Sequence, residues 1–309
     1  MQHFPTLDGV RLQKAYLAVG SFDGVHRGHQ HVVRSMVAEA HAHGGTPTVL
    51  TFFPHPSVVL GRRASTLYLT TPEERAALLA KLGVEIIITH PFTLEFSHTS
   101  AADILSRLVA DLGVRSLWAG MDFTLGHNRE GDREYLTRAG ARLGFEVHLV
   151  DPLIEDGAPI SSTRIRRALS QGDIAEVNRC LGRVFALTGQ VVYGAQRGAS
   201  LGIPTANVAV WEARAVPARG VYATWAEVGT RHLASVTNIG VRPTFAGQVE
   251  GQVVETHILD FDEDLYGQAL TVSFVARLRA EAKFAGVEPL RLQIRADIEQ
   301  ARSLLRRAS

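Results

Sequence analysis

Short apolar runs alternate with amphipathic segments through the first half of the chain. The apolar runs, each of strand length, lie at 15–20, 48–53, 84–90, 114–120 and 145–150, and helix-like segments lie at 28–43, 72–82, 99–112 and 131–143. This alternation predicts a parallel sheet with right-handed crossovers and helices on both faces. Such sheets bind ligands beyond the carboxyl ends of their strands, so the polar motifs that follow these runs are candidate site residues.

From about residue 184 the pattern changes to β-rich segments separated by turn residues. The expected strands lie at 186–194, 220–228, 232–240, 255–261 and 269–279. A run of this kind predicts an antiparallel barrel. A helix over 288–306 follows, with Glu288 and Pro289 in its first turn. We therefore predict two domains, 1–183 and 184–309, joined within the short segment 171–184.

Length and charge fit two domains of an ordinary globular protein. A chain of 309 residues can form two cores, because domains usually hold about 100–200 residues. The 32 basic and 31 acidic residues give a net charge of +1, which disfavours sequence-independent binding to nucleic acid or to an anionic membrane. We expect small-molecule substrates, and the sequence leaves the oligomeric state open.

The chain shows no pattern of a targeting or membrane segment. Residues 1–13 lack the apolar stretch of a signal peptide, and no apolar run approaches the roughly 18 residues that cross a bilayer. The single cysteine, Cys180, has no partner for an internal disulfide, which agrees with a reducing compartment. We expect a cytoplasmic protein.

The tetrad His26-Arg27-Gly28-His29 follows the first expected strand and opens the first expected helix. Both imidazoles would then lie near the amino end of that helix, where unpaired N–H groups and the helix dipole attract anions. Gly28 has no Cβ, so a phosphate could approach the backbone closely. Imidazole N–H groups can stabilise charge that develops while an α-phosphate is attacked. The tetrad therefore favours nucleotidyl transfer over simple binding.

Two other interpretations of the tetrad stay open at this point: exposed cap residues, or half of a metal site. A zinc site is disfavoured, because the chain contains neither a CxxC pair nor an HExxH helix.

Three further polar motifs follow the expected strands. His55 stands between two prolines, which favour an extended loop over a helix, although a rigid turn would explain them as well. Residues 120–131 contain three glycines that allow close backbone approach. Residues 160–166 place hydroxyls and two arginines at a helix start, where guanidinium groups could hold a triphosphate. The alternative for that last motif is a plain N-cap with solvated arginines.

These motifs together resemble a known family. SFDGVHRGHQ, TFFPHP, GMDFTLGHNREG and ISSTRIR resemble the FMN adenylyltransferase module of the prokaryotic bifunctional riboflavin kinase/FMN adenylyltransferase family, also called FAD synthetase. GQVVYGAQRGASLGIPTANV, RGVYATW, SVTNIGVRPTF and VETHILDFDEDLYG resemble its riboflavin kinase module. The resemblance covers nearly the whole chain. It implies an α/β Rossmann-like nucleotidyltransferase domain with a parallel sheet, followed by an antiparallel β-barrel domain with a C-terminal helix.

The resemblance also implies two reactions and their cofactors. Riboflavin and ATP would give FMN, and FMN and a second ATP would give FAD and pyrophosphate, with Mg²⁺ as the metal. In the first domain His26 and His29 would be catalytic, and His55 would lie near the flavin phosphate. The residues implied in binding ATP and its phosphates there are Gly20, Phe22, Asp23, Gly28, Asn128, Ser162, Thr163 and Arg166, of which Asn128 would also help to orient the metal.

In the second domain the resemblance makes Glu255 the base that takes the proton of the ribityl 5'-hydroxyl. The residues implied in ATP binding are Gly202, Pro204, Thr205, Asn207 and Arg197, with Thr205 and Asn207 also binding Mg²⁺. Structural alternatives are an edge-strand Pro204, a turn at Asn207 and an exposed strand position at Glu255. The family usually has Gly-Arg before this motif, whereas the chain has Gly198-Ala199, and we expect Arg197 to compensate.

Two other functions compete with this one. The chain could be a flavin-binding regulatory protein that has lost catalysis, but the intact set of catalytic residue types argues against that. It could also be a nucleotidyltransferase for another acceptor, such as a phosphopantetheine or nicotinamide mononucleotide, which the kinase-like second half disfavours.

Overall fold

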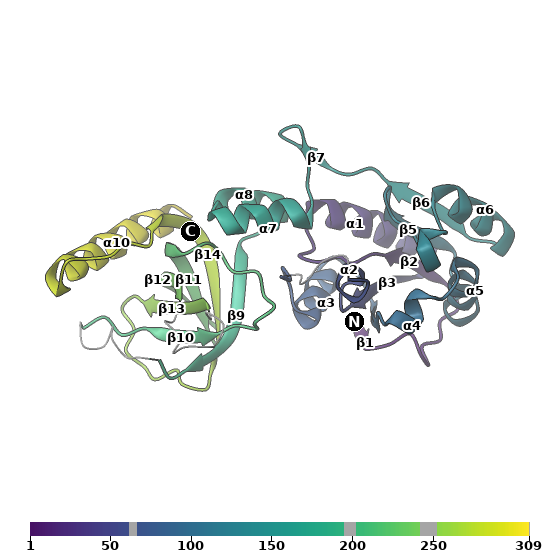
Figure 1. Cartoon of the computed structure of the whole chain (residues 1–309). Coiled ribbons are helices and arrows are strands. Elements are labelled where there is room, and N and C mark those ends of the chain that lie inside the picture. The colour runs from purple at the N-terminus through teal and green to yellow at the C-terminus, as the bar shows by residue number, and fades with distance from the viewer. Residues whose placement is uncertain (62–66, 195–201, 242–251, 309) are drawn as a thin grey trace. The chain divides into compact units, whose positions relative to one another are not determined.

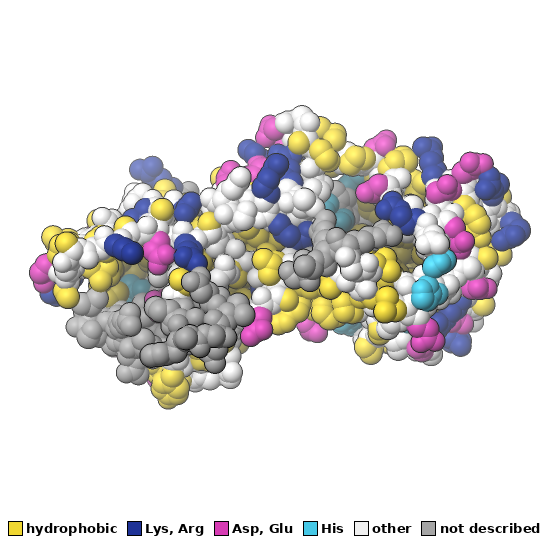
Figure 2. All heavy atoms as spheres, viewed as in Figure 1, with side chains coloured by type: hydrophobic (Ala, Val, Ile, Leu, Met, Phe, Trp, Pro, Cys, Tyr) yellow, Lys and Arg dark blue, Asp and Glu magenta, His cyan; other side chains and the backbone are white. Residues whose placement is uncertain are grey.

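The computed structural model describes residues 1–61, 67–194, 202–241 and 252–308 (Figure 1). The chain forms two compact units, Met1–Ser162 and Thr163–Ser309. On the face drawn in Figure 2, basic and acidic side chains are interspersed over both units, as expected from the net charge of +1.

The first unit is built on a six-stranded parallel sheet. Its strands are β1 (Gln2–Phe4), β2 (Ala15–Val19), β3 (Thr46–Phe53), β4 (Ile86–Pro91), β5 (Ser116–Gly120) and β6 (Glu146–Val150). Their order in the sheet is β1-β4-β3-β2-β5-β6, and every pair is parallel. The predicted parallel sheet is confirmed. The edge strand β1 was not predicted, because three residues without an apolar run carry no periodic signal.

Helices cover both faces of this sheet, as predicted. They are α1 (Arg27–Ala42), α3 (Pro72–Ala80), α5 (Ala101–Leu112) and α6 (Arg133–Leu143). Successive residues of a strand point to opposite faces, and the two cores follow this rule. Ala18 of β2 packs with α1 and α3, whereas Leu17 packs with α5 and α6.

Several short elements escaped the periodic pattern. They are the helices α2 (Pro56–Val59) and α4 (Leu94–Ser97), the 3₁₀ turn η1 (His127–Arg129) and a hairpin of β7 (Ile154–Glu155) and β8 (Ala158–Pro159). Elements of two to four residues are too short to show a helical or strand period.

The connections that leave the carboxyl ends of β2 and β5 run to opposite sides of the sheet. These strands are neighbours, but the chain leaves β2 through α1 toward β3 and leaves β5 through α6 toward β6, on the other side. Where connections diverge in this way, open α/β sheets bind their ligands. The tetrad follows β2, and the loop 121–131 follows β5.

The second unit is a closed antiparallel barrel with helices beside it. The helices α7 (Ser162–Gln171) and α8 (Ile174–Leu181) precede strands β9 (Phe185–Val192), β10 (Ala206–Ala209), β11 (Gly220–Val228), β12 (Arg231–Val241), β13 (Gln252–Ile258) and β14 (Ala269–Ala280), and α10 (Val287–Ala308) follows them. The order around the barrel is β10-β13-β12-β11-β14-β9. This confirms the predicted barrel and C-terminal helix. Helix α8 occupies most of the segment 171–184, in which the sequence places the domain junction.

A chain of buried hydroxyl groups crosses the barrel interior. Thr224 Oγ1 lies 2.7 Å from Ser235 Oγ and 2.8 Å from Thr237 Oγ1, which in turn lies 3.0 Å from Thr256 Oγ1. All four side chains are almost fully buried. Because each hydroxyl has a partner, the barrel tolerates these polar groups in its core.

Candidate active sites

His26 and His29 form a stacked pair at the start of α1. His26 is the N-cap residue, and its Nδ1 accepts a hydrogen bond from the His29 backbone N–H at 3.3 Å. The two ring centroids lie 3.6 Å apart with 19° between the planes. His26 is only 6% exposed, so the interpretation as exposed cap residues is wrong. A Cβ on Gly28 would lie 3.2 Å from the His26 ring, so the glycine also makes room for the stack.

His29 is held as a neutral ring. Burial lowers its pKa well below 6.5, and the nearby His26 and the charge of Arg75 lower it further. Its Nδ1 atom is buried and has no hydrogen-bond partner within the described part of the chain. Among the described residues, neither histidine belongs to a group of three side chains placed to hold a metal ion.

The loop between β2 and α1 has an uncommon backbone. Phe22, Gly24 and Val25 have φ values of 46°, 81° and 41°, in the left-handed region. Side chains other than glycine rarely adopt this region, so the surroundings must hold it. Phe22 and Val25 are both buried in the core beside α1, and the Phe22 ring meets the His29 ring edge-on at 5.2 Å. Packing therefore fixes the tight turn that delivers the histidines.

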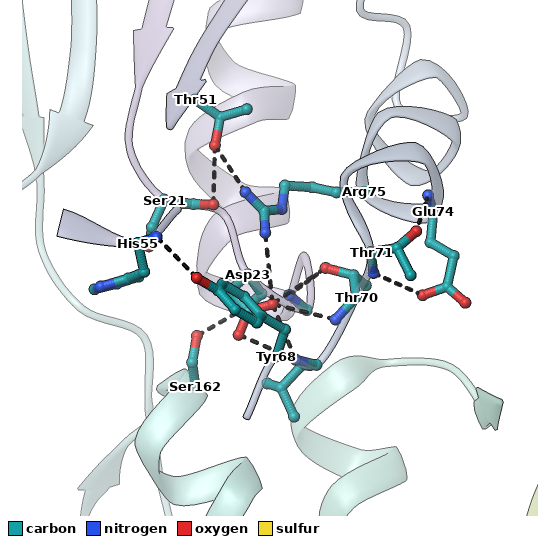
Figure 3. A network of polar contacts seen from close by, with 12 residues as sticks. Ser21, Asp23, Thr51, His55, Tyr68, Thr70, Thr71, Glu74, Arg75 and Ser162 are labelled. Atoms are coloured by element: carbon teal, nitrogen blue, oxygen red, sulfur yellow. Dashed lines mark hydrogen bonds and ion pairs between the residues drawn. The ribbon is translucent and has the colours of Figure 1, made fainter. Parts of the chain in front are cut away.

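Asp23, which belongs to the same loop, anchors it to residues 69–75 (Figure 3). Its carboxylate, 1% exposed, accepts hydrogen bonds from the backbone N–H groups of Leu69 and Thr70 at 3.0 and 3.1 Å and from the Thr70 hydroxyl at 3.2 Å. The guanidinium of Arg75 lies 3.8 Å away. Asp23 thus positions the loop, and its assignment as an ATP contact stays a prediction.

Arg75 is a site residue that the sequence analysis missed. It is 1% exposed, and it donates to Thr51 Oγ1 at 3.1 Å, which itself donates to the Ser21 carbonyl at 3.0 Å (Figure 3). One buried cation therefore connects α3, the end of β3 and the loop before the tetrad. The available signal was its place on the apolar side of α3, beside Ala76 and one turn before Leu79.

The motif 160–166 begins helix α7. Ser162 Oγ donates to the Asp23 carbonyl at 2.9 Å, so this predicted residue does reach the loop. Arg164 Nε donates to Glu176 at 2.5 Å, and its side chain is only 10% exposed, so solvated arginines are the wrong interpretation there. Thr163 and Arg166 belong to the second unit, and their assignment to the phosphates stays a prediction.

His55 has an extended backbone, as expected, with φ −64° and ψ 134°. His55 is not part of a helix, as expected, although Pro56 starts the short helix α2, a position that its fixed φ favours. His55 caps this turn: its Nδ1 accepts from Ser57 N–H at 3.1 Å, while its own N–H donates to the Tyr68 hydroxyl at 2.9 Å (Figure 3). A role at the flavin phosphate stays a prediction.

Asn128 lies in the loop after β5. It is exposed and left-handed, with φ 52° and ψ 22°, in the 3₁₀ turn. The loop is closed by paired backbone hydrogen bonds between Leu125 and Gly131 and anchored where Glu130 accepts from the N–H of Ala101 at 2.6 Å. The side chain of Asn128 is therefore presented to solvent on a fixed loop, as a ligand contact requires.

Strand register assembles the second site. Glu255 on β13 pairs directly with Asn207 on β10 and with Asn238 on β12, so the three side chains share one face of the barrel wall. Asn207 lies inside a strand, so the interpretation as a turn residue is wrong. Glu255 is half-buried rather than exposed. Asn238 was missed because only the register places it beside the carboxylate.

Asn207 has the properties of a metal ligand. It is 6% exposed, and its Oδ1 has no hydrogen-bond partner in the described part of the chain. Gly194 lies against the amide, where a Cβ would come within 2.2–2.5 Å. A buried oxygen without a donor is costly unless something binds it, and Mg²⁺ prefers oxygen ligands. The residue therefore fits the predicted metal.

A cavity of about 260 Å³ lies beside Ala206 and Thr256, whereas Asn207 and Glu255 do not line it. Thr205, which is half-buried, and Pro204, which is exposed, both line it. The other lining residues are Val191, Ala206, Thr256, Ile258, Phe261, Asp262, Glu263, Asp264, Leu265 and Tyr266. His257 Nδ1 lies 2.7 Å from the carbonyl oxygen of Pro204, one of these lining residues. Gly202 is exposed with φ 73°, and Arg197 and Ala199 lie outside the described residues.

Known proteins match both units. Family models match residues 10–164, as FAD synthetase, and residues 181–305, as riboflavin kinase. A bifunctional riboflavin kinase/FMN adenylyltransferase from Listeria monocytogenes is 39% identical, over 93% of this chain and 91% of the relative. The protein of the same name from Pseudomonas fluorescens is 38% identical with the same coverage.

A solved structure matches the whole fold. It is described as a macrolide-efflux protein from Streptococcus pneumoniae, with a TM-score of 0.88, 30% identity, and coverage of 97% of this chain and 98% of that one. Within the residues described for the present chain, no helix is both long and apolar enough to cross a membrane.

Proposed function

The chain belongs to the bifunctional riboflavin kinase/FMN adenylyltransferase family, and on that premise we propose how its residues divide the two reactions. The enzyme phosphorylates riboflavin to FMN with ATP, and it then adenylylates FMN with a second ATP to give FAD and pyrophosphate. This membership disfavours both competing functions, a decayed regulatory protein and a transferase for another acceptor. The efflux description belongs to the solved structure alone, and no contact described above favours transport.

We assign adenylylation to residues 1–183 and phosphorylation to residues 184–309. The two family models support this assignment, because the first ends at residue 164, in the first turn of α7, and the second begins at residue 181, the last residue of α8. A cytoplasmic location stays a prediction.

The stacked histidines are the observation that carries the adenylylation proposal. An FMN phosphate oxygen attacks the α-phosphorus of ATP, the bond to the β-phosphate breaks, and pyrophosphate leaves. Because His26 Nδ1 accepts a hydrogen bond, it carries no proton, and Nε2 is the ring nitrogen that can donate. A phosphate oxygen would satisfy the unpartnered Nδ1 of His29 if that atom carries the ring proton. Both donors would stabilise charge that develops on the α-phosphoryl oxygens.

Glu255 carries the proposal for phosphorylation. Its carboxylate accepts the proton of the ribityl 5'-hydroxyl, the oxygen attacks the γ-phosphorus of ATP, and ADP leaves. Thr205 and Asn207 would hold Mg²⁺, which neutralises phosphate charge when bound. The unpartnered Oδ1 of Asn207, one strand away from Glu255, supports this division of roles.

A chromatographic time course tests both proposals together. The enzyme is incubated with riboflavin, ATP and Mg²⁺, and riboflavin, FMN and FAD are separated at intervals. We expect FMN to rise first and FAD to follow, and we expect neither product when Mg²⁺ is chelated. Failure to form FMN would contradict the kinase assignment, and failure to convert supplied FMN would contradict the adenylyltransferase assignment.

A further inference from the structure

Three side chains with metal-ligating groups meet on the first unit, away from the tetrad. Glu39 comes from the last turns of α1, and Glu146 and His148 come from the amino end of β6, whereas the tetrad follows the carboxyl end of β2. His148 Nε2 lies 3.5 Å from Glu39 Oε1 and 3.4 Å from Glu146 Oε2. One donor atom of each side chain lies within 4.8 Å of the other two.

These spacings suit a shared metal ion better than direct hydrogen bonds. Charge-assisted hydrogen bonds between nitrogen and a carboxylate measure about 2.7–2.9 Å, well below the observed separations. Ligand atoms placed about 2.1 Å from a tetrahedral Zn²⁺ lie roughly 3.4 Å from each other. In agreement, His148 Nε2 is a buried atom that makes no hydrogen bond in the described chain.

Neighbouring side chains orient two of the three ligands. Glu39 Oε2 accepts from Ser116 Oγ at 2.8 Å and from Trp118 Nε1 at 2.6 Å, which leaves Oε1 directed at His148. The His148 ring stacks on Trp118, with centroids 4.2 Å apart and 18° between the planes. Metal sites in proteins commonly have such outer hydrogen bonds, which fix the ligand geometry before the ion arrives.

We infer that Glu39, Glu146 and His148 bind one divalent transition-metal ion of the zinc type, with water at the fourth position. One imidazole and two carboxylates suit Zn²⁺, whereas Mg²⁺ and Ca²⁺ prefer oxygen ligands alone. Glu146 has 76% of its side chain exposed, so the ion can enter from solvent. The bound ion would join α1 to β6 and stabilise the first unit without touching either reaction.

Isothermal titration of the full-length, chelator-treated enzyme with Zn²⁺ tests the inference. An excess of Mg²⁺ is present so that the substrate metal site does not compete. We expect a wild-type site with a stoichiometry of one that disappears in His148→Ala. Trp118→Phe keeps the ring stack but removes the donor to Glu39, and it should weaken binding by about tenfold. Zn²⁺ should also raise the thermal midpoint of the wild type, by roughly 5 °C at saturation, and not that of His148→Ala.

His41→Ala is the matched control, because His41 also lies beside a carboxylate, that of Glu85 at 3.8 Å, but has no third ligand among the residues that the structure describes. It should bind Zn²⁺ as the wild type does. Glu146→Gln is the second ligand variant, and it serves if His148→Ala does not fold. It changes an exposed residue that cannot disturb the core, and it should weaken Zn²⁺ binding at least tenfold. Unchanged rates of FMN and FAD formation show that each variant is folded. The inference is overturned if the wild type lacks the site, or if both ligand variants bind Zn²⁺ as the wild type does.

Discussion

The two candidate active sites are assembled in opposite ways. His26 and His29 are three residues apart, and one turn of α1 brings their rings together. Asn207 and Glu255 are 48 positions apart and meet only through the pairing of β10 with β13. The first site is therefore a property of a local segment, and the second is a property of strand register. This difference predicts which changes each activity tolerates.

The electrostatic roles that we propose for His29 and Glu255 differ as well. His29 is kept neutral by burial, which suits a donor that stabilises charge only as the α-phosphate is attacked. Glu255 is half-buried on the barrel wall, where a carboxylate can accept a proton from a hydroxyl. Changes at one site should consequently leave the other reaction intact.

The largest separation is expected from Glu255→Gln. The amide keeps the shape of the side chain but cannot accept a proton, so FMN formation should fall by roughly 10²–10⁴-fold. Conversion of supplied FMN to FAD should continue at the wild-type rate. Chromatography measures the rate of FMN formation from riboflavin and the rate of FAD formation from FMN. An unimpaired rate of FMN formation would show that Glu255 is not the base.

His29→Ala gives the converse result. Loss of one transition-state donor should slow FAD formation from FMN by roughly 10²–10³-fold, with riboflavin phosphorylation nearly unchanged. The same two assays apply. Equal loss of both activities in a folded variant would contradict the model of two separate sites.

Arg75→Ala tests how the local site is supported. It leaves Asp23 buried without its cation, which typically costs about 3–5 kcal/mol of the free energy of unfolding. Urea denaturation followed by the fluorescence of Trp118, the tryptophan of the first unit, measures this. The control is Arg138→Ala, whose partner Glu134 is exposed and whose loss should cost less than about 1 kcal/mol. Similar losses in the two variants would show that the buried pair is not needed.

Gly194→Ala tests how the distant site is supported. Its new Cβ would displace the Asn207 amide, so the kinase should slow by about tenfold or more while adenylylation continues. Gly286→Ala is the control, because the nearest atom to its Cβ, on Pro289, is 4.0 Å away. Equal kinase rates in Gly194→Ala and Gly286→Ala would show that the position of the Asn207 amide does not matter for phosphorylation.

The smallest effect concerns pH. Because burial lowers the pKa of His29, the ring stays neutral near pH 6 and the rate of FAD formation should not fall with a midpoint at 6.5. The unfolded ring does bind a proton below about pH 6.5, so the wild type should lose stability there by up to 1.4 kcal/mol per pH unit. His29→Ala should lack that part of the slope. Urea denaturation between pH 5 and 8 measures the difference, and parallel slopes would mean that His29 titrates normally.

The sequence predicts what depends on local spacing. Periodicity placed the strands and helices of the sheet, and the spacing within the tetrad placed both histidines at one helix start. Neither Arg75 nor Asn238 could be found in this way. In the sequence, Arg75 is one of several charged residues of a helix, and only the fold shows that it is buried beside Asp23. Asn238 lies beside Glu255 only because of the register of β12 with β13.

The hydroxyl chain inside the barrel has a consequence for the register of β13. Along β13, Thr256 faces inward and joins that chain, while Glu255 faces outward. A slip of β13 by one residue would exchange them, sending a carboxylate into an interior with only hydroxyl partners and breaking the chain. The inner surface of the barrel thus disfavours a misaligned β13, and it favours the register in which Glu255 lies beside Asn207 and Asn238.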